Sequence, residues 1–141
     1  MNIEIIINKL ISNIEIRDAK AVTNMFSKDA LFEEMVGTGG VAHGQEAIGR
    51  LWENFFKDVS KDKKDNRWDI QRKIINGKSA AIERISNFVY KDRKVSIGMV
   101  AIIELDEDDK IKVYKDYCDS RVFIEQNDID GWNAYLESQK K

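Results

Sequence analysis

The chain has 141 residues, of which 43% are hydrophobic and 34% are charged, a balance typical of a folded domain rather than of a disordered segment. Its 23 Lys and Arg residues nearly balance its 25 Asp and Glu residues, giving a formal net charge of -2, so no basic surplus favours nucleic acid as a partner. His43 is the only histidine and Cys118 the only cysteine, which excludes an intrachain disulfide and any cysteine-rich or multi-histidine metal site.

Residues 2–27 are predicted to form two helices. Isoleucine and leucine recur at spacings of three and four between Ile3 and Ile14, which is the pattern of an amphipathic helix. Asp18 is expected to cap a second, shorter helix. Glu4 stands where a signal peptide would carry basic residues, and no apolar run reaches membrane-spanning length. We therefore expect a cytoplasmic protein without a membrane partner.

A short strand and a third helix are expected next. Residues 30–35 alternate as a strand does, with Phe32 and Glu34 on one face. The glycine-rich segment 37–40 is predicted to be a plain loop, because it lacks the lysine and hydroxyl spacing of a phosphate-binding loop. Residues 45–58 carry a broad apolar face at helical spacing, and the polar run that follows them is expected to be a solvated connection.

From residue 68 onward the hydrophobic period changes to two, which indicates strands. Four strands are predicted, at residues 68–75, 79–90, 94–105 and 112–123. Asn76-Gly77 is a strong hairpin signal, and short polar turns join the later strands, so the four should form an antiparallel meander. Apolar residues near the C-terminus predict a closing helix; they are Phe123, Ile124, Ile129, Trp132, Tyr135 and Leu136. No repeat or boundary divides the sequence, so one domain spanning residues 1–141 is expected.

The last predicted strand carries the strongest candidate for a functional group. Alternation places Tyr114, Asp116 and Cys118 on one face of this strand. A carboxylate beside a tyrosine and a small thiol is a candidate pocket residue, because a buried unpaired charge is unfavourable and perturbed acids gather in clefts. The alternative is that Asp116 pairs with an arginine in a purely structural ion pair.

Three short segments carry a resemblance to a known superfamily. They are residues 26–32 (FSKDALF), residues 43–48 (HGQEAI) and residues 115–119 (KDYCD). Together with the element order, they resemble the NTF2-like superfamily of cone-shaped α+β proteins, which includes SnoaL-like polyketide cyclases, ketosteroid isomerases and limonene-epoxide hydrolases. The resemblance implies a curved antiparallel sheet packed on N-terminal helices, with a small-molecule pocket at the open end of the cone.

The resemblance to the epoxide hydrolases assigns roles to particular residues. Asp116 falls on their general base, and Arg84 falls on their bridging arginine. Ser86 stands where those enzymes have an aspartic acid as proton donor, and a serine alcohol is a poor substitute for it. Phe32 and Glu34 stand where a tyrosine and an asparagine hold the water. In the SnoaL-like cyclases an aspartate on a late strand is thought to act as the base, which again favours Asp116.

Glu34, Arg84 and Asp116 are expected to face one cavity as its catalytic residues. An arginine beside two acids would hold at least one of them ionised. If Glu34 is desolvated in that cavity, its pKa should rise, which would set a neutral acid opposite an ionised base. Such a pair suits an isomerase or a cyclase that removes a proton next to a carbonyl. The alternative is an inward-facing polar network that performs no chemistry.

The sequence therefore predicts a protein that binds a small, apolar, oxygenated ligand. It is expected to be either an enzyme that uses no metal or organic cofactor, or a non-catalytic ligand-binding or dimerisation module. A cavity with Asp116 and Arg84 at its floor would favour the enzyme, and a cavity filled by Phe32, Trp52 and Met99 would favour the module. A homodimer paired through the outer sheet face is implied by the resemblance. The predicted substrate-binding residues are Phe32, Trp52, Ser86, Met99, Tyr114 and Cys118.

Overall fold

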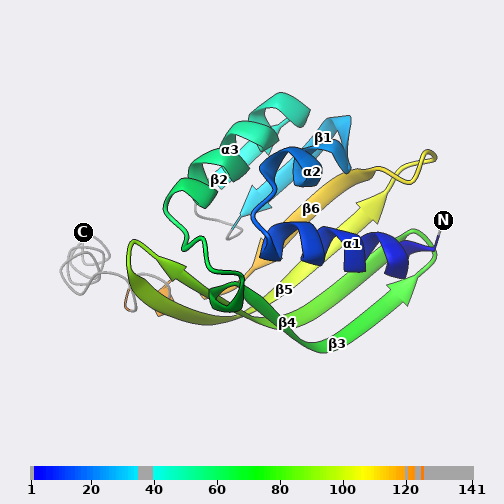
Figure 1. Cartoon of the computed structure of the whole chain (residues 1–141). Coiled ribbons are helices and arrows are strands. Elements are labelled where there is room, and N and C mark those ends of the chain that lie inside the picture. The colour runs from blue at the N-terminus through cyan, green and yellow to red at the C-terminus, as the bar shows by residue number, and fades with distance from the viewer. Residues whose placement is uncertain (1, 35–39, 120, 123–124, 126–141) are drawn as a thin grey trace, which may run out of the picture.

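A computed structural model describes residues 2–34, 40–119, 121, 122 and 125 of the chain. Within these residues helices lie against a six-stranded sheet (Figure 1). The helices are α1 (Ile3–Glu15), α2 (Ala19–Asn24), α3 (Gln45–Lys57) and the short 3-10 helix η1 (Lys63–Asp65). The strands are β1 (Phe26–Glu34), β2 (Gly40–His43), β3 (Arg67–Asn76), β4 (Ser79–Tyr90), β5 (Arg93–Leu105) and β6 (Ile111–Tyr117).

The sheet is curved and mixed, and its strand order is β2-β1-β6-β5-β4-β3. Strands β3 to β6 form the predicted antiparallel meander. Strand β1 joins this meander in parallel with β6, while β2 pairs with β1 in the antiparallel sense. Helices α1, α2 and α3 all lie on one side of the sheet (Figure 1). This arrangement confirms the predicted α+β fold class.

The core lies between the helices and the inner face of the sheet. Burial alternates along β5, where Val95, Ile97 and Met99 begin a row of buried residues separated by more exposed ones. The row continues with Ala101, Ile103 and Leu105, which share one cluster with the apolar stripe of α1, where Ile7 and Leu10 are fully buried. Both periodicities, two in the strands and three to four in the helix, direct their apolar side chains to one interior.

The passage from β2 into α3 depends on a glycine. Gly44 has φ of 85°, a backbone conformation that L side chains rarely adopt. Its N–H donates to the carbonyl of Ala30 at 2.8 Å, which fastens the turn to β1. The side chain of Gln45 then donates to the carbonyls of Thr23 and Phe26 at 3.2 and 2.9 Å. These bonds fix the first turn of α3 against α2 and β1.

The predicted boundaries need three corrections. The second helix ends at Asn24, and β1 already begins at Phe26, which pairs with Ile111 of β6. Strand β2 was not predicted, although residue 40 of the predicted loop belongs to it. Strand β6 ends at Tyr117 instead of residue 123, because the chain turns at Asp119, whose side chain accepts from the Arg121 N–H at 3.0 Å. Residues 35–39 and the predicted C-terminal helix lie outside the described residues, apart from residue 125.

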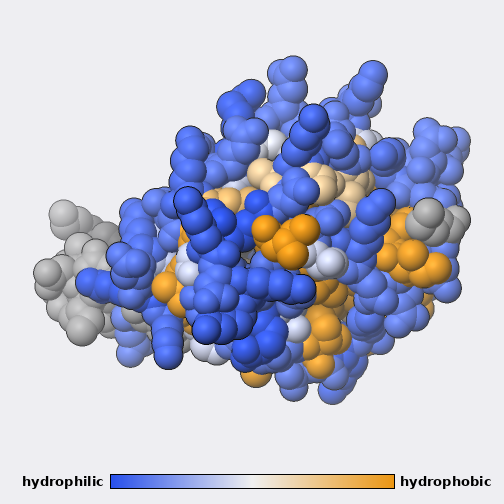
Figure 2. All heavy atoms as spheres, viewed as in Figure 1, coloured by the Kyte–Doolittle hydropathy of each residue, from blue (hydrophilic) through white to orange (hydrophobic). Residues whose placement is uncertain are grey.

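The view in Figure 2 shows a mainly hydrophilic surface interrupted by separate hydrophobic patches. Exposed apolar residues include Ile74, Ile85 and Tyr117, which are 58%, 37% and 44% exposed. Ile85 and Tyr117 lie on the sheet face that points away from the helices, since their neighbours Arg84 and Asp116 are buried on the inner face. No helix among the described residues is long and apolar enough to cross a membrane.

Candidate active site

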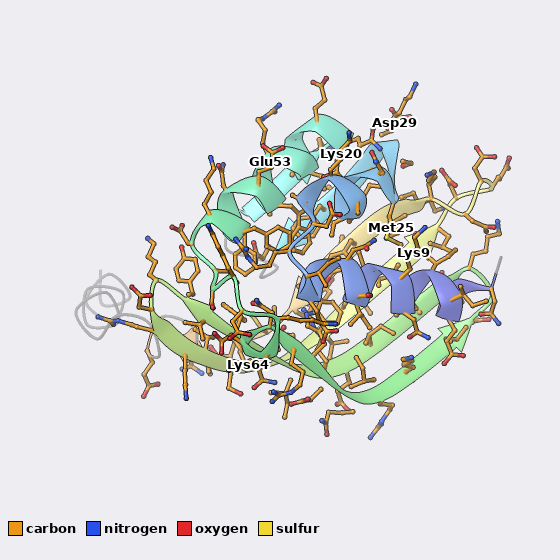
Figure 3. All side chains as sticks on the ribbon, in the orientation of Figure 1. Lys9, Lys20, Met25, Asp29, Glu53 and Lys64 are labelled. Carbon is orange, nitrogen blue, oxygen red and sulfur yellow. The ribbon has the colours of Figure 1, made fainter. Side chains whose placement is uncertain are left out.

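A cavity of about 50 Å³ lies between the inner face of the sheet, α3 and the end of α1. Helix α3 is amphipathic: Trp52 and Phe56 point into the protein, whereas Glu53 is exposed on the opposite side (Figure 3). The wall combines aromatic and aliphatic side chains with several polar and charged ones, and such a mixture can both bury and orient a small molecule. The lining residues are Ile14, Glu15, Phe32, Glu34, Leu51, Trp52, Phe55, Phe56, Asn66, Arg67, Trp68, Arg84, Ser86, Asn87, Phe88, Ile97, Met99 and Asp116.

Arg84 and Asp116 form a buried, two-pronged ion pair in the wall of this cavity. Arg84 Nη1 donates to Asp116 Oδ1 at 2.8 Å, and Arg84 Nη2 donates to Asp116 Oδ2 at 3.1 Å. The two side chains are only 2% and 7% exposed. Such bidentate, charge-assisted bonds are the strongest class of side-chain hydrogen bond. The pair is therefore a fixed feature of the wall.

The strand register explains how these two side chains meet. Arg84 on β4 is opposite Met99 of β5, and Asp116 on β6 is opposite Ala101, two residues further along β5. The flanking strands β4 and β6 are about 10 Å apart, so the long arginine side chain must cross β5 to reach the carboxylate. The small side chain of Ala101 leaves room for this crossing, and Met99 Sδ lies 3.5 Å from Arg84 Nη2.

Two aromatic residues hold the ion pair from either side. The guanidinium carbon of Arg84 lies 3.7 Å from the centre of the Trp68 ring, a close cation–π contact. The Tyr114 hydroxyl donates to Asp116 Oδ2 at 3.0 Å. Tyr114 is fully buried, and burial raises its pKa well above 10, so it stays a neutral donor. Asp116 thus accepts three hydrogen bonds, an environment that suits an ionised carboxylate.

The charge of Arg84 survives its burial. Desolvation lowers the pKa of Arg84, but the neighbouring Asp116 and Tyr114 outweigh it, and the net pKa is raised. Asp116 is the ion-pair partner of Arg84. The local charges of the pair cancel, which leaves the cavity without a net charge from these two groups.

Glu34 lines the same cavity, and its surroundings raise its pKa. Glu34 keeps part of its surface exposed, yet desolvation raises its pKa from 4.5 to about 7. The negative charge of Asp116 raises this pKa further, and Arg84 only partly offsets both effects. Near neutral pH, Glu34 therefore exchanges readily between its protonated and ionised forms. Among the three acids that line the cavity, Asp116 is paired with Arg84, and Glu34 has a pKa of about 7.

Seven of the nine predicted site residues line the cavity. Phe32, Trp52, Ser86 and Met99 do so beside the three charged residues. Tyr114 lies behind the wall, stacked on Phe32 with ring centres 4.9 Å apart, and reaches the site only through its bond to Asp116. Cys118 follows the end of β6 and packs against a separate hydrophobic cluster formed by Val95, Ile97 and Met99. Burial and the nearby acids raise the pKa of its thiol to about 11, so the thiol is protonated at neutral pH.

The structure also brings residues to the cavity beyond the predicted set. Phe55 and Phe56 come from the apolar face of α3, and Phe88 joins them from β4. The Phe55 and Phe88 rings meet edge to face at 5.5 Å. The apolar face of α3 was visible in the sequence, but nothing in the sequence indicates which part of that face borders a cavity. Among the described residues, no group of three or more His, Cys, Asp or Glu side chains is placed to hold a metal ion.

Comparison with known proteins supports the fold. The family model of the SnoaL-like domain matches residues 7–114 of the chain. No curated protein is significantly similar to the chain in sequence. A hypothetical protein with a ketosteroid isomerase-like fold from Catenulispora acidiphila DSM 44928, solved with trimethylamine, is 15% identical with a TM-score of 0.74. The match covers 86% of this chain and 90% of that one.

Two further solved structures are similar across most of their length. An LEH-like epoxide hydrolase from M. tuberculosis is 17% identical with a TM-score of 0.72, and the match covers 94% of this chain and 93% of that one. SalBIII, an epoxide hydrolase/cyclase-like enzyme of pyran ring formation in the polyether salinomycin, is 18% identical with a TM-score of 0.71. That match covers 82% of this chain and 89% of SalBIII. At these identities the likeness concerns the fold.

Proposed function

The chain belongs to the SnoaL-like domain family, and from that premise we propose that it binds a small, oxygenated, largely apolar molecule and transfers protons to and from it. The proposed catalytic residues are Glu34, Asp116 and Arg84. Phe32, Trp52, Ser86 and Met99 are proposed to contact the ligand, since they line the same cavity. The proposal involves side-chain acid–base chemistry alone and assigns no step to a metal or an organic cofactor.

The reaction proposed is an isomerisation through an enol. Asp116, as the carboxylate, removes a proton from the carbon next to a carbonyl, while protonated Glu34 donates its proton to the carbonyl oxygen. The C–H bond breaks, an O–H bond forms, and the substrate becomes an enol. Return of the oxygen-bound proton to Glu34, with delivery of the proton on Asp116 to a different carbon, completes the isomerisation and restores both acids. The same enol, formed beside a second carbonyl, would attack it in a cyclisation.

One observation carries this proposal: Asp116 and Glu34, two of the acids that line the cavity, have different surroundings. Asp116 is held by Arg84 and Tyr114, whereas the pKa of Glu34 is raised to about 7. Pairs of acids whose environments separate their pKa values are the usual basis of acid and base assignments in enzymes. A donor that titrates near the working pH is also the most effective proton donor.

Epoxide opening is a related reaction that the same groups support. Ser86 occupies the cavity wall, but its alcohol proton is too weakly acidic to activate an epoxide oxygen. Protonated Glu34 would supply that proton instead, and Asp116 would accept a proton from the attacking water. Glu34 is therefore the proposed acid for both reactions.

Proton abstraction can be tested before the natural substrate is known. Small enolisable ketones, such as cyclohexanone, are incubated with the protein in D2O, and the loss of the proton signal next to the carbonyl is followed by NMR. The exchange rate should fall as the pH rises through about 7, because Glu34 loses the proton it donates. Asp116→Asn should abolish the exchange, and Glu33→Gln, which changes the neighbouring acid on β1, should leave it intact. Undiminished exchange in Asp116→Asn would remove Asp116 from the mechanism.

A non-catalytic binding or dimerisation module is the second candidate, and two observations favour it. The cavity is only about 50 Å³, because Phe32, Trp52 and Met99 are all buried in its wall. A shallow groove on the outer sheet face is lined by Ile85 and Tyr117, among others, and we propose this face as a homodimer interface. A protein that sediments as a dimer and gives no exchange with any ketone would favour this second function.

A further inference from the structure

Two residues that line the cavity each carry a buried N–H group without a hydrogen-bond partner among the described residues. These groups are Nε1 of Trp52 and Nε of Arg84. The two residues are only 6% and 3% exposed, so bulk water does not reach these atoms. Buried donors without an acceptor are unfavourable and rare in native proteins, and each one calls for an acceptor from elsewhere.

Packing does not satisfy the polar group of the Trp52 indole. The Trp52 ring meets Phe32 edge to face at 5.5 Å, and it also contacts Phe55 and Phe56, at 6.2 and 5.4 Å. Besides the volume of its second ring, the indole adds one donor to what a phenyl ring offers, the Nε1–H group. Arg84 has a different reason to be present, because its Nη atoms bind Asp116. Trp52 Nε1–H therefore indicates a missing acceptor more directly than Arg84 Nε does.

The charged side chains around the cavity restrict which ligands can accept a hydrogen bond from Trp52 Nε1–H. The charges of Arg84 and Asp116 cancel each other, and Glu34 is neutral when protonated. The other charged lining residues, Glu15 and Arg67, are also engaged, since Glu15 accepts from the Trp68 N–H and Arg67 is paired with Asp69. An anionic ligand would therefore meet three acids and two arginines that are already paired. Any ion would also lose its hydration in this cavity, which is strongly unfavourable without a free counter-charge. An uncharged ligand fits these conditions.

We propose that Trp52 Nε1–H is a ligand-binding donor, and that the ligand is a compact, uncharged molecule whose carbonyl or cyclic-ether oxygen accepts from it. This inference rests on the proposed function for the location of the site and for the ligand class, and it adds the donor that holds the ligand oxygen. The cavity of about 50 Å³ is smaller than the roughly 150 Å³ of a cavity that admits benzene, so binding a ring requires the aromatic part of the wall to move.

The indole N–H signals of the three tryptophans provide a direct readout by NMR. The Trp52 signal is assigned as the one that Trp52→Phe removes. Cyclohexanone and methylenecyclohexane have nearly the same shape, but only cyclohexanone carries an oxygen acceptor. Cyclohexanone should move the Trp52 signal downfield, as a new hydrogen bond does, whereas methylenecyclohexane should not. Equal shifts with both molecules, or no shift with cyclohexanone up to its solubility limit, would overturn the proposal.

Affinities provide a second test with a matched control. The wild-type protein should prefer cyclohexanone to methylenecyclohexane, and Trp52→Phe should reduce this preference by about three- to tenfold, the usual contribution of one neutral hydrogen bond. The affinity for methylenecyclohexane is the control, because that molecule has the same shape without an acceptor, and Trp52→Phe should leave it nearly unchanged. An unchanged preference in Trp52→Phe would contradict the proposal.

The outcomes separate this inference from the proposed catalysis. If cyclohexanone shifts the Trp52 signal but its protons do not exchange with D2O, the ligand class is supported and the enolisation step fails. If the protons exchange while Trp52→Phe binds both molecules as the wild type does, enolisation is supported and the role of Trp52 is wrong. Melting temperatures of Trp52→Phe check that the variant is folded in either case.

Discussion

Replacing Glu34 by Gln should change how the stability of the protein depends on pH. The folded protein holds the Glu34 proton more tightly than the unfolded chain does, because its pKa is about 7 when folded against an ordinary value of 4.5. The contribution of the bound Glu34 proton to the free energy of unfolding is fully present below pH 4.5, and it is lost as the pH rises to about 7. Each tenfold change in the protonation equilibrium corresponds to about 1.4 kcal/mol, so the total loss is about 3 kcal/mol.

Glutamine has the shape of protonated glutamate but does not ionise, so Glu34→Gln removes this loss. Relative to the wild type, the variant should gain about 3 kcal/mol of unfolding free energy between pH 4.5 and pH 8. Urea denaturation followed by tryptophan fluorescence measures this difference, and contributions from all other groups cancel in it. Glu33→Gln, the same change at the adjacent position of β1, should follow the wild type. Parallel curves for Glu34→Gln and the wild type would refute the reasoning.

Two further predictions concern the ion pair and its aromatic support. Arg84→Met should destabilise the protein by about 3–5 kcal/mol in urea denaturation, because it leaves Asp116 buried without a counter-charge, and Arg84→Met with Asp116→Leu should recover much of that loss. A single variant that loses less than about 1 kcal/mol would show that Asp116 is not effectively buried. Trp68→Leu should lose about 1–2 kcal/mol through the missing cation–π contact, whereas Trp68→Tyr, which keeps an aromatic face, should lose less. Equal losses in the two Trp68 variants would show that the aromatic face over Arg84 contributes nothing to stability.

The regular elements were predictable because each one repeats a single pattern several times. Strands β4 and β5 alternate buried and more exposed residues over most of their length, and Asn76-Gly77 marks the turn between β3 and β4. Strand β2 is only four residues long, and Ala42 is its only buried residue. Such a segment offers no alternation of large apolar residues, and its pairing with β1 is what makes it a strand. The early end of β6 depends on side-chain bonds at Asp119, which periodicity does not detect.

The candidate site was predictable to the extent that strand faces determine it. Alternation places Glu34 on the same face as Phe32, and the superfamily resemblance points to Arg84 and Asp116. Their contact, however, depends on the register of β4, β5 and β6, which includes an irregularity between Glu104 and Leu105. A shift of one residue would turn a whole strand to the opposite face. The stacking of Trp68 on Arg84 and the position of Tyr114 behind Asp116 follow from this three-dimensional register, which the sequence does not display.

The most direct test of the account is an NMR titration of the Glu34 side-chain carboxyl carbon, assigned by its absence in Glu34→Gln. The proposed reaction requires that Glu34 changes its protonation state near neutral pH while Asp116 stays paired with Arg84. A titration midpoint at about pH 7 is the predicted result. A midpoint near the ordinary value of 4.5 would contradict it, because Glu34 would then be ionised at neutral pH and unable to act as the acid.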